Sequence, residues 1–252
     1  MRSIVLITAR LGSSRLPGKM LADLRGRSVL AVLVERLRLA QRPAGMVLAT
    51  TQEPEDDALE AAARELGLDV YRGETNDVLM RWLGAAKATD AELLVCCDGD
   101  DVFCDAAHVD RVIECHEATG ADYITCEGLP FGTAPNGVGR AGLERVCARK
   151  QDTDTEGQGR FFNDPSLIRR EVVHAPEAMR HDTARMTLDY PEDLRFSEAV
   201  LDGLAADGPS PPLEHIVAFL HEHPEVVAIN ASLQEEYWAR FNARYPPVTL
   251  AD

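Results

Sequence analysis

The most informative stretch of the sequence is a basic loop near its start. Positions 10 to 27 hold five cations and one anion, whereas the whole chain carries a formal net charge of −16. Small residues within the loop let backbone amides approach an anion, and Lys and Arg donate charge-assisted hydrogen bonds to phosphate oxygens. The spacing matches neither the Walker A motif nor the G-x-G-x-x-G motif. We predict phosphate binding here, with a solvated basic loop as the alternative. The cations are Arg10, Arg15, Lys19, Arg25 and Arg27, and the small residues are Gly12, Ser13, Ser14 and Gly18.

Acidic residues follow two later apolar runs. Asp98, Asp100 and Asp101 come after the run 92–97, and Asp189 comes after the run 186–188. Parallel strands bring their carboxyl ends to one edge of a sheet, so these acids are expected to face the same crevice as the basic loop. Two local alternatives remain: Asp100 is a turn residue, and Asp189 is an N-cap ahead of Pro191.

Short apolar runs alternate with helical patterns along the chain, which predicts a doubly wound, mostly parallel α/β sheet. Expected strands cover 4–8, 46–49, 70–71, 92–97, 123–126 and 186–188. Expected helices cover 29–37, 54–66, 78–88, 105–118, 141–150, 191–204, 213–220 and 224–244. The predicted organisation is an α/β domain over 1–206, with a looser Gly- and Pro-rich insertion at 129–185, and a C-terminal helical extension over 213–246. The aromatic residues of that extension are interpreted as a packing arm.

Composition excludes several functions. A chain with 26 basic and 42 acidic residues is not expected to bind duplex nucleic acid through a general basic face. No apolar run is long enough for a transmembrane helix, and the N-terminal run is too short for a signal peptide, so a cytoplasmic location without membrane contact is expected. The six cysteines contain no C-x-x-C pair and are interpreted as free thiols.

The twelve residues Thr8–Lys19 strongly resemble the signature loop of the sugar-acid cytidylyltransferases. This family includes the CMP-Kdo synthetases, the CMP-acylneuraminate synthetases and related spore-coat polysaccharide proteins, and the last branch resembles the chain most. The resemblance continues in order to about residue 200. The further matching segments are 26–30, 35–36, 49–51, 72–74, 76–79, 99–100 and 188–194.

The resemblance implies a Rossmann-like nucleotide-diphospho-sugar transferase fold and a homodimer. It also implies a Mg²⁺-dependent enzyme that transfers CMP from CTP to an acidic acceptor and releases pyrophosphate. In that scheme Asp100 and Asp189 hold Mg²⁺, and Lys19, Arg10 and Asp100 are catalytic. The nucleotide contacts carried over or inferred are Ala9, Arg10, Gly12, Ser13, Ser14, Arg15, Lys19, Thr50, Asn76, Asp77 and Asp98.

Two parts of the chain depart from the family pattern. Asp98 stands where the Kdo enzymes have glutamine, so it is either a further metal contact or a contact to the base, where it suits the cytosine amino group and guanine equally well. The insertion at 129–185 is predicted to bind the acceptor and to form the dimer interface, and it resembles neither the Kdo nor the neuraminate enzymes. Its candidate acceptor contacts are Asn136, Glu156, Arg160, His181 and Arg185, and the alternative is an exposed polar flap with structural salt bridges.

Two other functions are compatible with parts of this pattern. A GT-A-type glycosyltransferase also has a nucleotide-binding α/β sheet and a D-x-D metal motif, which Asp98 and Asp100 match. The donor of such an enzyme, a nucleoside diphosphate sugar, carries no triphosphate, so it would not require the cluster of cations in the basic loop. A non-catalytic nucleotide sensor would predict loss of Lys19 or of an acid, and none is lost.

Overall fold

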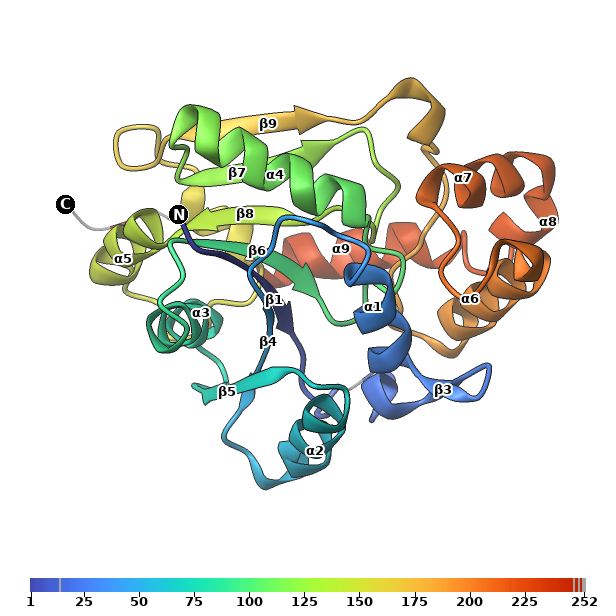
Figure 1. Cartoon of the computed structure of the whole chain (residues 1–252), viewed down its shortest axis with the longest axis horizontal. Coiled ribbons are helices and arrows are strands. Elements are labelled where there is room, and N and C mark those ends of the chain that lie inside the picture. The colour runs from blue at the N-terminus through green and yellow to red at the C-terminus, as the bar shows by residue number, and fades with distance from the viewer. Residues whose placement is uncertain (14, 247, 249, 251–252) are drawn as a thin grey trace.

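A computed structural model describes residues 1–13, 15–246, 248 and 250. Its centre is a seven-stranded sheet with helices on both faces (Figure 1). The sheet confirms the predicted doubly wound, mostly parallel architecture, with one antiparallel strand, β8, between β6 and β7. In spatial order the strands are β5 (Asp69–Gly73), β4 (Met46–Thr51), β1 (Ser3–Thr8), β6 (Leu93–Asp98), β8 (Asn136–Gly139), β7 (Tyr123–Glu127) and β9 (Arg170–His174).

The central strand β1 shows how the sequence builds two cores. Successive side chains of a strand point to opposite faces of the sheet. Val5 and Ile7 therefore enter one apolar core, and Ile4 and Leu6 enter the other. All four side chains are at most 2% exposed, so β1 lies fully inside the molecule. Its carboxyl end is the place where the basic loop begins.

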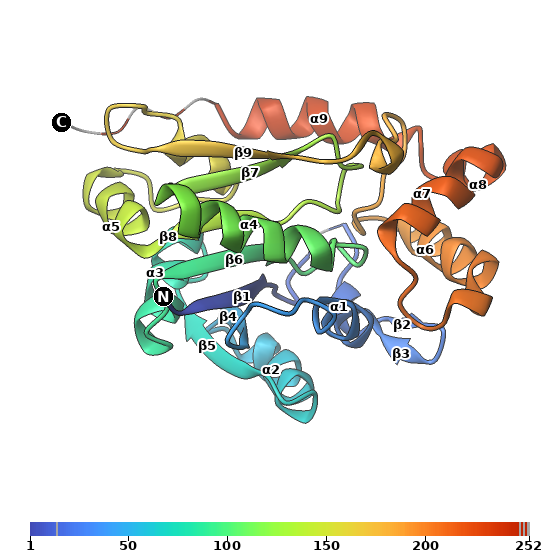
Figure 2. The same ribbon diagram turned by 45° about the horizontal axis from the view of Figure 1, so that its top comes forward.

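Helices cover both faces of the sheet. Helices α1 (Val29–Leu37), α2 (Asp57–Glu65) and α4 (Ala106–Thr119) pack into the core that holds Val5, whereas α3 (Val78–Ala88) and α5 (Arg140–Arg149) pack into the other. Helices α6 (Pro191–Gly203), α7 (Leu213–Glu222) and α8 (Pro224–Val227) form a group beside the sheet, and α9 (Leu233–Arg244) runs behind it, on the side opposite α4 (Figures 1 and 2). The short elements are the hairpin β2 (Asp23–Leu24) and β3 (Arg27–Ser28), and the 3₁₀ turns 19–21, 54–56, 158–162, 177–179 and 205–207.

Side-chain caps mark the starts of two of the predicted helices, α1 and α3. The Ser28 hydroxyl accepts a hydrogen bond from the amide of Ala31, and the Asp77 carboxylate accepts one from the amide of Met80. The N-cap of α3 is therefore Asp77. The predicted helix 224–244 is wrong as a single element, because turns at 228–232 divide it into α8 and α9.

One predicted strand is wrong, and two strands were not predicted. The run 186–188 is not a strand: it contains a bend at Thr187 and is bound by single hydrogen bonds, such as the Leu188 amide to the Asp100 carbonyl. Strand β9 was not expected. Strand β8 lies within the Gly-rich insertion, where Gly137 is required because a Cβ atom would lie 2.6 Å from Val112 Cγ1. Glycine lowers strand propensity, so its sequence gave no strand pattern.

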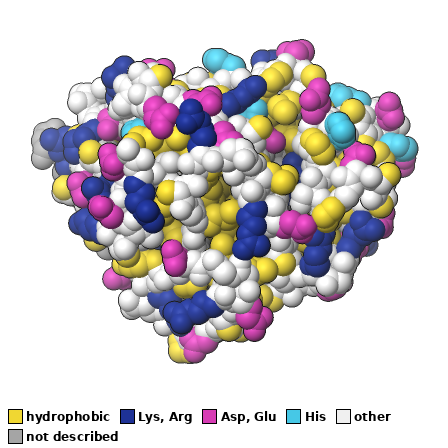
Figure 3. Space-filling model, in the orientation of Figure 1, with side chains coloured by type: hydrophobic (Ala, Val, Ile, Leu, Met, Phe, Trp, Pro, Cys, Tyr) yellow, Lys and Arg dark blue, Asp and Glu magenta, His cyan; other side chains and the backbone are white. Residues whose placement is uncertain are grey.

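The surface and the helices bear on two further expectations. On the face shown in Figure 3, the described Lys and Arg side chains are interspersed with Asp and Glu and form no continuous basic area. Within the described residues, every helix is too short or too polar to span a bilayer. Helix α7 contributes Leu213 and Ile216 to the core that holds Val5, so the C-terminal extension packs directly on the α/β domain. The proposed division of the chain at 206 and 213 stays a prediction.

Candidate functional site

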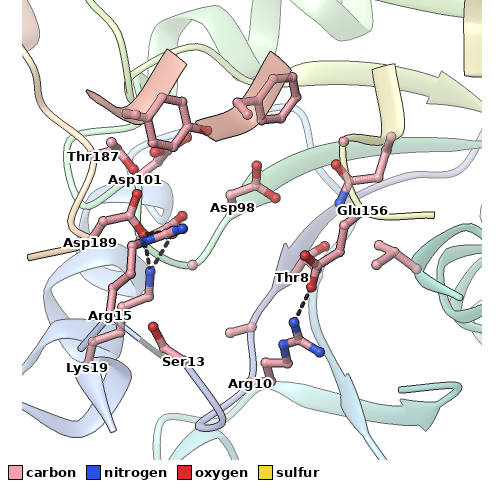
Figure 4. Close-up of a pocket in the computed structure, with 18 of the residues that line it drawn as sticks. Thr8, Arg10, Ser13, Arg15, Lys19, Asp98, Asp101, Glu156, Thr187 and Asp189 are labelled. Carbon is pink, nitrogen blue, oxygen red and sulfur yellow. Dashed lines mark hydrogen bonds and ion pairs between the residues drawn. The ribbon is translucent and has the colours of Figure 1, made fainter. Parts of the chain in front are cut away.

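A cavity of about 590 Å³ lies at the carboxyl ends of β1 and β6. The last residues of these strands, Thr8 and Asp98, both line it. The basic loop forms one wall, and the segment 187–190 forms another (Figure 4). The structure therefore brings the loop and the acids together at one sheet edge, as their positions after strands predicted. The predicted residues that line the cavity are Ala9, Arg10, Gly12, Ser13, Arg15, Lys19, Asp98, Asp100, Glu156 and Asp189.

Lys19 links the two carboxylates that were predicted to bind metal. Its ammonium donates hydrogen bonds to Asp100 Oδ2 at 2.6 Å, to Asp189 Oδ1 at 2.9 Å and to the Leu188 carbonyl at 2.9 Å. The side chain is almost fully buried. Burial alone would lower the pKa of Lys19, but the charges of Asp100 and Asp189 raise it above its usual value. The lysine therefore stays protonated between the two acids.

Asp189 is the most heavily engaged acid of the site. Besides Lys19, its carboxylate accepts hydrogen bonds from Arg15 and from Arg185 Nη2, the latter at 3.2 Å. Burial alone would raise the pKa of Asp189, but the charges of Lys19 and Arg15 bring it to about 2. The alternative of an N-cap is wrong, because the N-cap of α6 is Tyr190. Asp193, in the first turn of the helix, accepts at its Oδ2 from the amides of Asp189 and Tyr190 at 2.8 and 2.9 Å.

The opposite side of the cavity is organised around Glu156. Its carboxylate pairs with Arg10 and accepts a hydrogen bond from the Tyr245 hydroxyl at 2.5 Å, with Arg244 Nη2 3.7 Å away (Figure 4). Burial would raise the pKa of Glu156, but the bond from Tyr245 and the charge of Arg10 lower it. Arg10 and Arg15, neighbours in the loop, are thus engaged with different walls of the cavity.

Two acids lie between these walls. Asp98 projects into the cavity between Lys19 and Glu156, and Asp101 lies beside Thr187 (Figure 4). Enclosure by protein and the nearby charge of Asp100 raise the pKa of Asp98 to about 7, and the same two causes raise the pKa of Asp101 well above its usual range. This agrees with the expectation that acids so close in sequence raise one another's pKa.

Gly99 lets the acidic turn approach the basic loop closely. A Cβ atom at this position would lie 2.7 Å from the Ala9 Cβ and 2.9 Å from Met20 Cε. Real Cβ contacts are rarely that short, so only glycine fits without displacing one of the two neighbours. The motif Asp98-Gly99-Asp100 is thus shaped by packing as well as by the chemistry of its acids.

Several predicted contacts lie away from the cavity. The Thr50 hydroxyl is fully buried and donates to Asp56, and Asp77 is occupied as the α3 cap and by an ion pair with Lys150. Asn76, Asn136, Arg160 and His181 are not among the described lining residues. Arg185 is fully buried beneath the wall, where it holds Asp189 and Asp193, so it cannot contact an acceptor directly. Ser14 lies outside the described residues.

Other lining residues were missed from the sequence. Arg81 on α3 is 2% exposed and lines the cavity, and no partner of its Nε is found among the described atoms. Burial, reinforced by the charge of Arg10, lowers its pKa to about 10. In the sequence, Arg81 looks like an ordinary surface arginine of a helix, so no sequence pattern predicts that it lines the cavity. The C-terminal helix also contributes lining residues, which are Tyr237, Arg240, Phe241 and Arg244, followed by Tyr245.

The residues present fit a divalent cation only in part. Within the described residues, no three histidine, cysteine, aspartate or glutamate side chains converge as a ready metal site. Asp100 and Asp189 nevertheless share one cation, the Lys19 ammonium, at 2.6 and 2.9 Å. Two carboxylates suit a hard ion such as Mg²⁺ when substrate oxygens and water complete its coordination. The donor set therefore fits an ion that binds together with a phosphate-bearing substrate.

Comparison with known proteins decides the family. The family model described as cytidylyltransferase matches residues 4–200. The chain belongs to the cytidylyltransferase family. This confirms the resemblance carried by the loop and by the order of the later segments, and it makes the chain an enzyme of this class.

Relatives and solved structures agree with this assignment. A spore coat polysaccharide biosynthesis protein, SpsF, of Bacillus subtilis is 30% identical over 88% of this chain and 95% of its own. A 3-deoxy-manno-octulosonate cytidylyltransferase of Chlorobium limicola is 29% identical over 72% of this chain and 71% of its own. The solved structure of a cytidylyltransferase from Leptospira borgpetersenii superposes with a TM-score of 0.81 at 22% identity, over 90% of this chain and 97% of that one. The structural likeness confirms the fold.

Proposed function

We propose that this cytidylyltransferase transfers CMP from CTP to an acidic acceptor in a Mg²⁺-dependent reaction. The observation that carries the proposal is the Lys19–Asp100–Asp189 cluster, which lies in the same cavity as Arg10 and Arg15. Nucleotidyl transfer needs mainly positioning and neutralisation of charge, and this cavity supplies both cations and metal-binding carboxylates.

In the proposed reaction an acceptor oxygen attacks the α-phosphorus of CTP. The new P–O bond forms as the bond from the α-phosphorus to the bridging oxygen breaks, and pyrophosphate leaves with the electron pair. Lys19, Arg10 and Arg15 bind the triphosphate and stabilise the charge on the leaving group. Asp100 and Asp189 hold Mg²⁺, which when bound supplies charge neutralisation at the phosphates.

In the absence of substrate, these cations are held by acids of the protein itself. Arg10 pairs with Glu156, and Lys19 and Arg15 pair with Asp189. Triphosphate binding therefore exchanges protein carboxylates for phosphate oxygens. The protein carboxylates orient the cations before CTP arrives, so little reordering is needed on binding.

The base and the assembly belong to the same proposal. Asp98 projects into the cavity, where its carboxylate is able to accept from the amino group of cytosine, while uracil would present an acceptor to it. We also propose that the enzyme is a homodimer, as the resemblance implies, and that it is cytoplasmic, as its N-terminal sequence suggests. A GT-A-type glycosyltransferase is not supported, because membership of the cytidylyltransferase family accounts for the acids and for the triphosphate-sized set of cations.

Pyrophosphate release tests the proposal. The enzyme is incubated with Mg²⁺, each of CTP, UTP, GTP and ATP, and a panel of sugar acids, sugar phosphates and phosphonates. We expect release only with an acidic acceptor, and preference for CTP over UTP by about 1–3 kcal/mol, which Asp98→Asn reduces. Lys87→Ala, at an exposed position of α3, is the control. Equal turnover of all four nucleotides would contradict the proposed contact between Asp98 and the cytosine base. Absence of pyrophosphate with every acceptor would contradict the proposed function.

A further inference from the structure

Helix α9 has an unusual relation to the rest of the molecule. None of its twelve described residues is buried, although it lies against the cavity. One of its faces carries two rows of lining residues at a spacing of four, which places them side by side on a helix. The first row is aromatic and the second is basic. On α9 the rows are Tyr237 and Phe241, and Arg240 and Arg244, and Tyr245, which follows the helix, extends the aromatic row.

The aromatic row contacts both walls of the cavity. At one end Tyr237 packs against Phe131, with ring centroids 5.1 Å apart, and over the Arg185 guanidinium at 5.0 Å. At the other end Tyr245 donates its hydroxyl to Glu156. The helix therefore bridges the wall that holds Asp189 and the wall that holds Arg10. A substrate portion that extends beyond the phosphates meets this helix.

The two arginines of α9 are more loosely held than the other cations of the cavity. Arg244 lies 3.7 and 3.8 Å from the carboxylates of Glu156 and Asp154, beyond ordinary hydrogen-bond distance, and its side chain is 62% exposed. Arg240 pairs with Glu236 on the helix surface and donates to the Tyr190 hydroxyl at 3.1 Å. Exposed pairs of this kind are weak, so a ligand anion displaces them at little cost.

Charge also indicates an anionic ligand in addition to the triphosphate. Six cationic and five carboxylate side chains are among the described residues that line the cavity, although the chain as a whole carries a net charge of −16. With Arg10, Arg15 and Lys19 assigned to the triphosphate, the arginines of α9 are the exposed cations that remain for a second ligand. Guanidinium groups bind carboxylates and phosphates through paired hydrogen bonds.

We infer that α9 is the acceptor-recognising wall, in which Arg240 and Arg244 bind the anionic group of the acceptor and Tyr237 and Phe241 stack against its carbohydrate ring. The inference rests on the proposed function and names the acceptor as an anionic sugar. Its charged group is a carboxylate or a phosphate. These are specificity residues, because they contact the acceptor and lie away from the phosphorus that reacts.

Binding of anionic probes to the CTP-loaded enzyme tests this role. Wild type and Arg240→Gln/Arg244→Gln are saturated with Mg²⁺ and a CTP analogue whose α–β bridge is methylene, and probes are then titrated by calorimetry. The probes are 3-deoxy-manno-octulosonate, a hexose phosphate and inorganic phosphate. We expect at least about a tenfold loss of affinity for the best anionic probe in the double variant, with the Kd of the CTP analogue changed less than twofold. Asn242→Ala, an exposed α9 residue away from the cavity, is expected to bind like wild type.

The aromatic row has its own measurement. Phe241→Leu is expected to weaken the sugar probes and leave inorganic phosphate unchanged, because only a sugar ring stacks on the aromatic face. Comparison of 3-deoxy-manno-octulosonate with the hexose phosphate distinguishes a carboxylate from a phosphate acceptor. An unchanged probe affinity in the double variant would overturn the inference, as would an equal loss of CTP-analogue affinity or the failure of every anionic probe to bind wild type. Failure of the CTP analogue itself to bind would instead count against the proposed function.

Discussion

The two sides of the cavity differ in how firmly they are built. One side holds Lys19, Asp100 and Asp189 and is called the metal side here after its proposed role. There, Asp189 is 1% exposed and is held by Lys19, Arg15 and Arg185. On the α9 side, Arg244 is largely exposed and its carboxylate partners lie beyond hydrogen-bond distance. The difference fits the two proposed roles: the groups proposed for phosphate chemistry are held firmly by the protein, and those proposed to bind the acceptor are free to adjust to it.

The largest expected effect tests the rigidity of the metal side. Asp189→Asn removes a buried charge that Lys19, Arg15 and Arg185 share, although Lys19 keeps Asp100 and Arg185 keeps Asp193. We therefore expect a loss of about 3 kcal/mol of unfolding free energy, the lower end of the cost of breaking a buried pair. Urea unfolding measures this loss. Asp202→Asn is the matched control, because its pair with Arg25 is exposed and is expected to contribute less than about 1 kcal/mol. Equal stability of the two variants would mean that the metal side is no more firmly built than the surface.

The second prediction separates catalysis from stability on the same side. Asp100 is partly exposed, and Lys19 keeps Asp189 as a partner when Asp100 is changed. Asp100→Asn is therefore expected to lower kcat by at least about 100-fold, or about 2.7 kcal/mol, with a change in unfolding free energy below about 1 kcal/mol. Steady-state pyrophosphate release and urea unfolding give the two values. Full activity in this variant would remove Asp100 from the metal site.

A smaller effect is expected with acid. The pKa of Asp189 in the folded protein is about 2, below its value in an unfolded chain, so its contribution is complete above about pH 4 and disappears as the pH falls through about 2. The shift corresponds to about 2 kcal/mol. Between pH 4.5 and 2, wild type is expected to lose about that much more unfolding free energy than Asp189→Asn. Parallel losses in the two proteins would contradict the assignment.

The smallest effect concerns predicted contacts that lie outside the cavity. Asn76 is exposed, and Thr50 is turned toward Asp56, so neither side chain is in a position to touch the nucleotide. Asn76→Ala is expected to change the KM for CTP less than twofold. Thr50→Val is expected to lower the unfolding free energy by about 1 kcal/mol through its lost hydrogen bond, again with the KM for CTP unchanged. A tenfold rise in that KM for either variant would show that the cavity extends further than its lining residues indicate.

The metal side was predictable because its parts lie where sequence patterns are strongest. Lys19 belongs to a twelve-residue motif, and Asp100 follows an apolar central strand whose carboxyl end must face the ligand edge. Asp189 lies at the predicted edge of the sheet, but the reason for that prediction was partly wrong, since the run before it forms no strand. The prediction that Asp189 belongs to the site therefore depended more on the resemblance of the segment 188–194 to the family than on the local sequence pattern.

The other side depends on contacts between distant segments. Glu156 lies in a polar stretch without periodicity, and it reaches the cavity because Phe161 and Phe162 bury the end of that stretch in the second core. Helix α9 has an aromatic pattern that also suits a packing arm. Its approach to the cavity is set by the break after α8 and by the hydrogen bonds from Asn230 to the Arg185 carbonyl and Asp193. Such geometry follows from tertiary packing, which no local pattern records.

The lysine held between two carboxylates has a kinetic consequence. A bare divalent ion has to displace a buried ammonium that makes three hydrogen bonds, and it offers that ammonium no new partner. An ion that arrives already chelated by a triphosphate brings the oxygens to which Lys19 is able to turn. We therefore expect an ordered sequence of arrival, in which free Mg²⁺ has little affinity for the resting enzyme and enters together with its nucleotide.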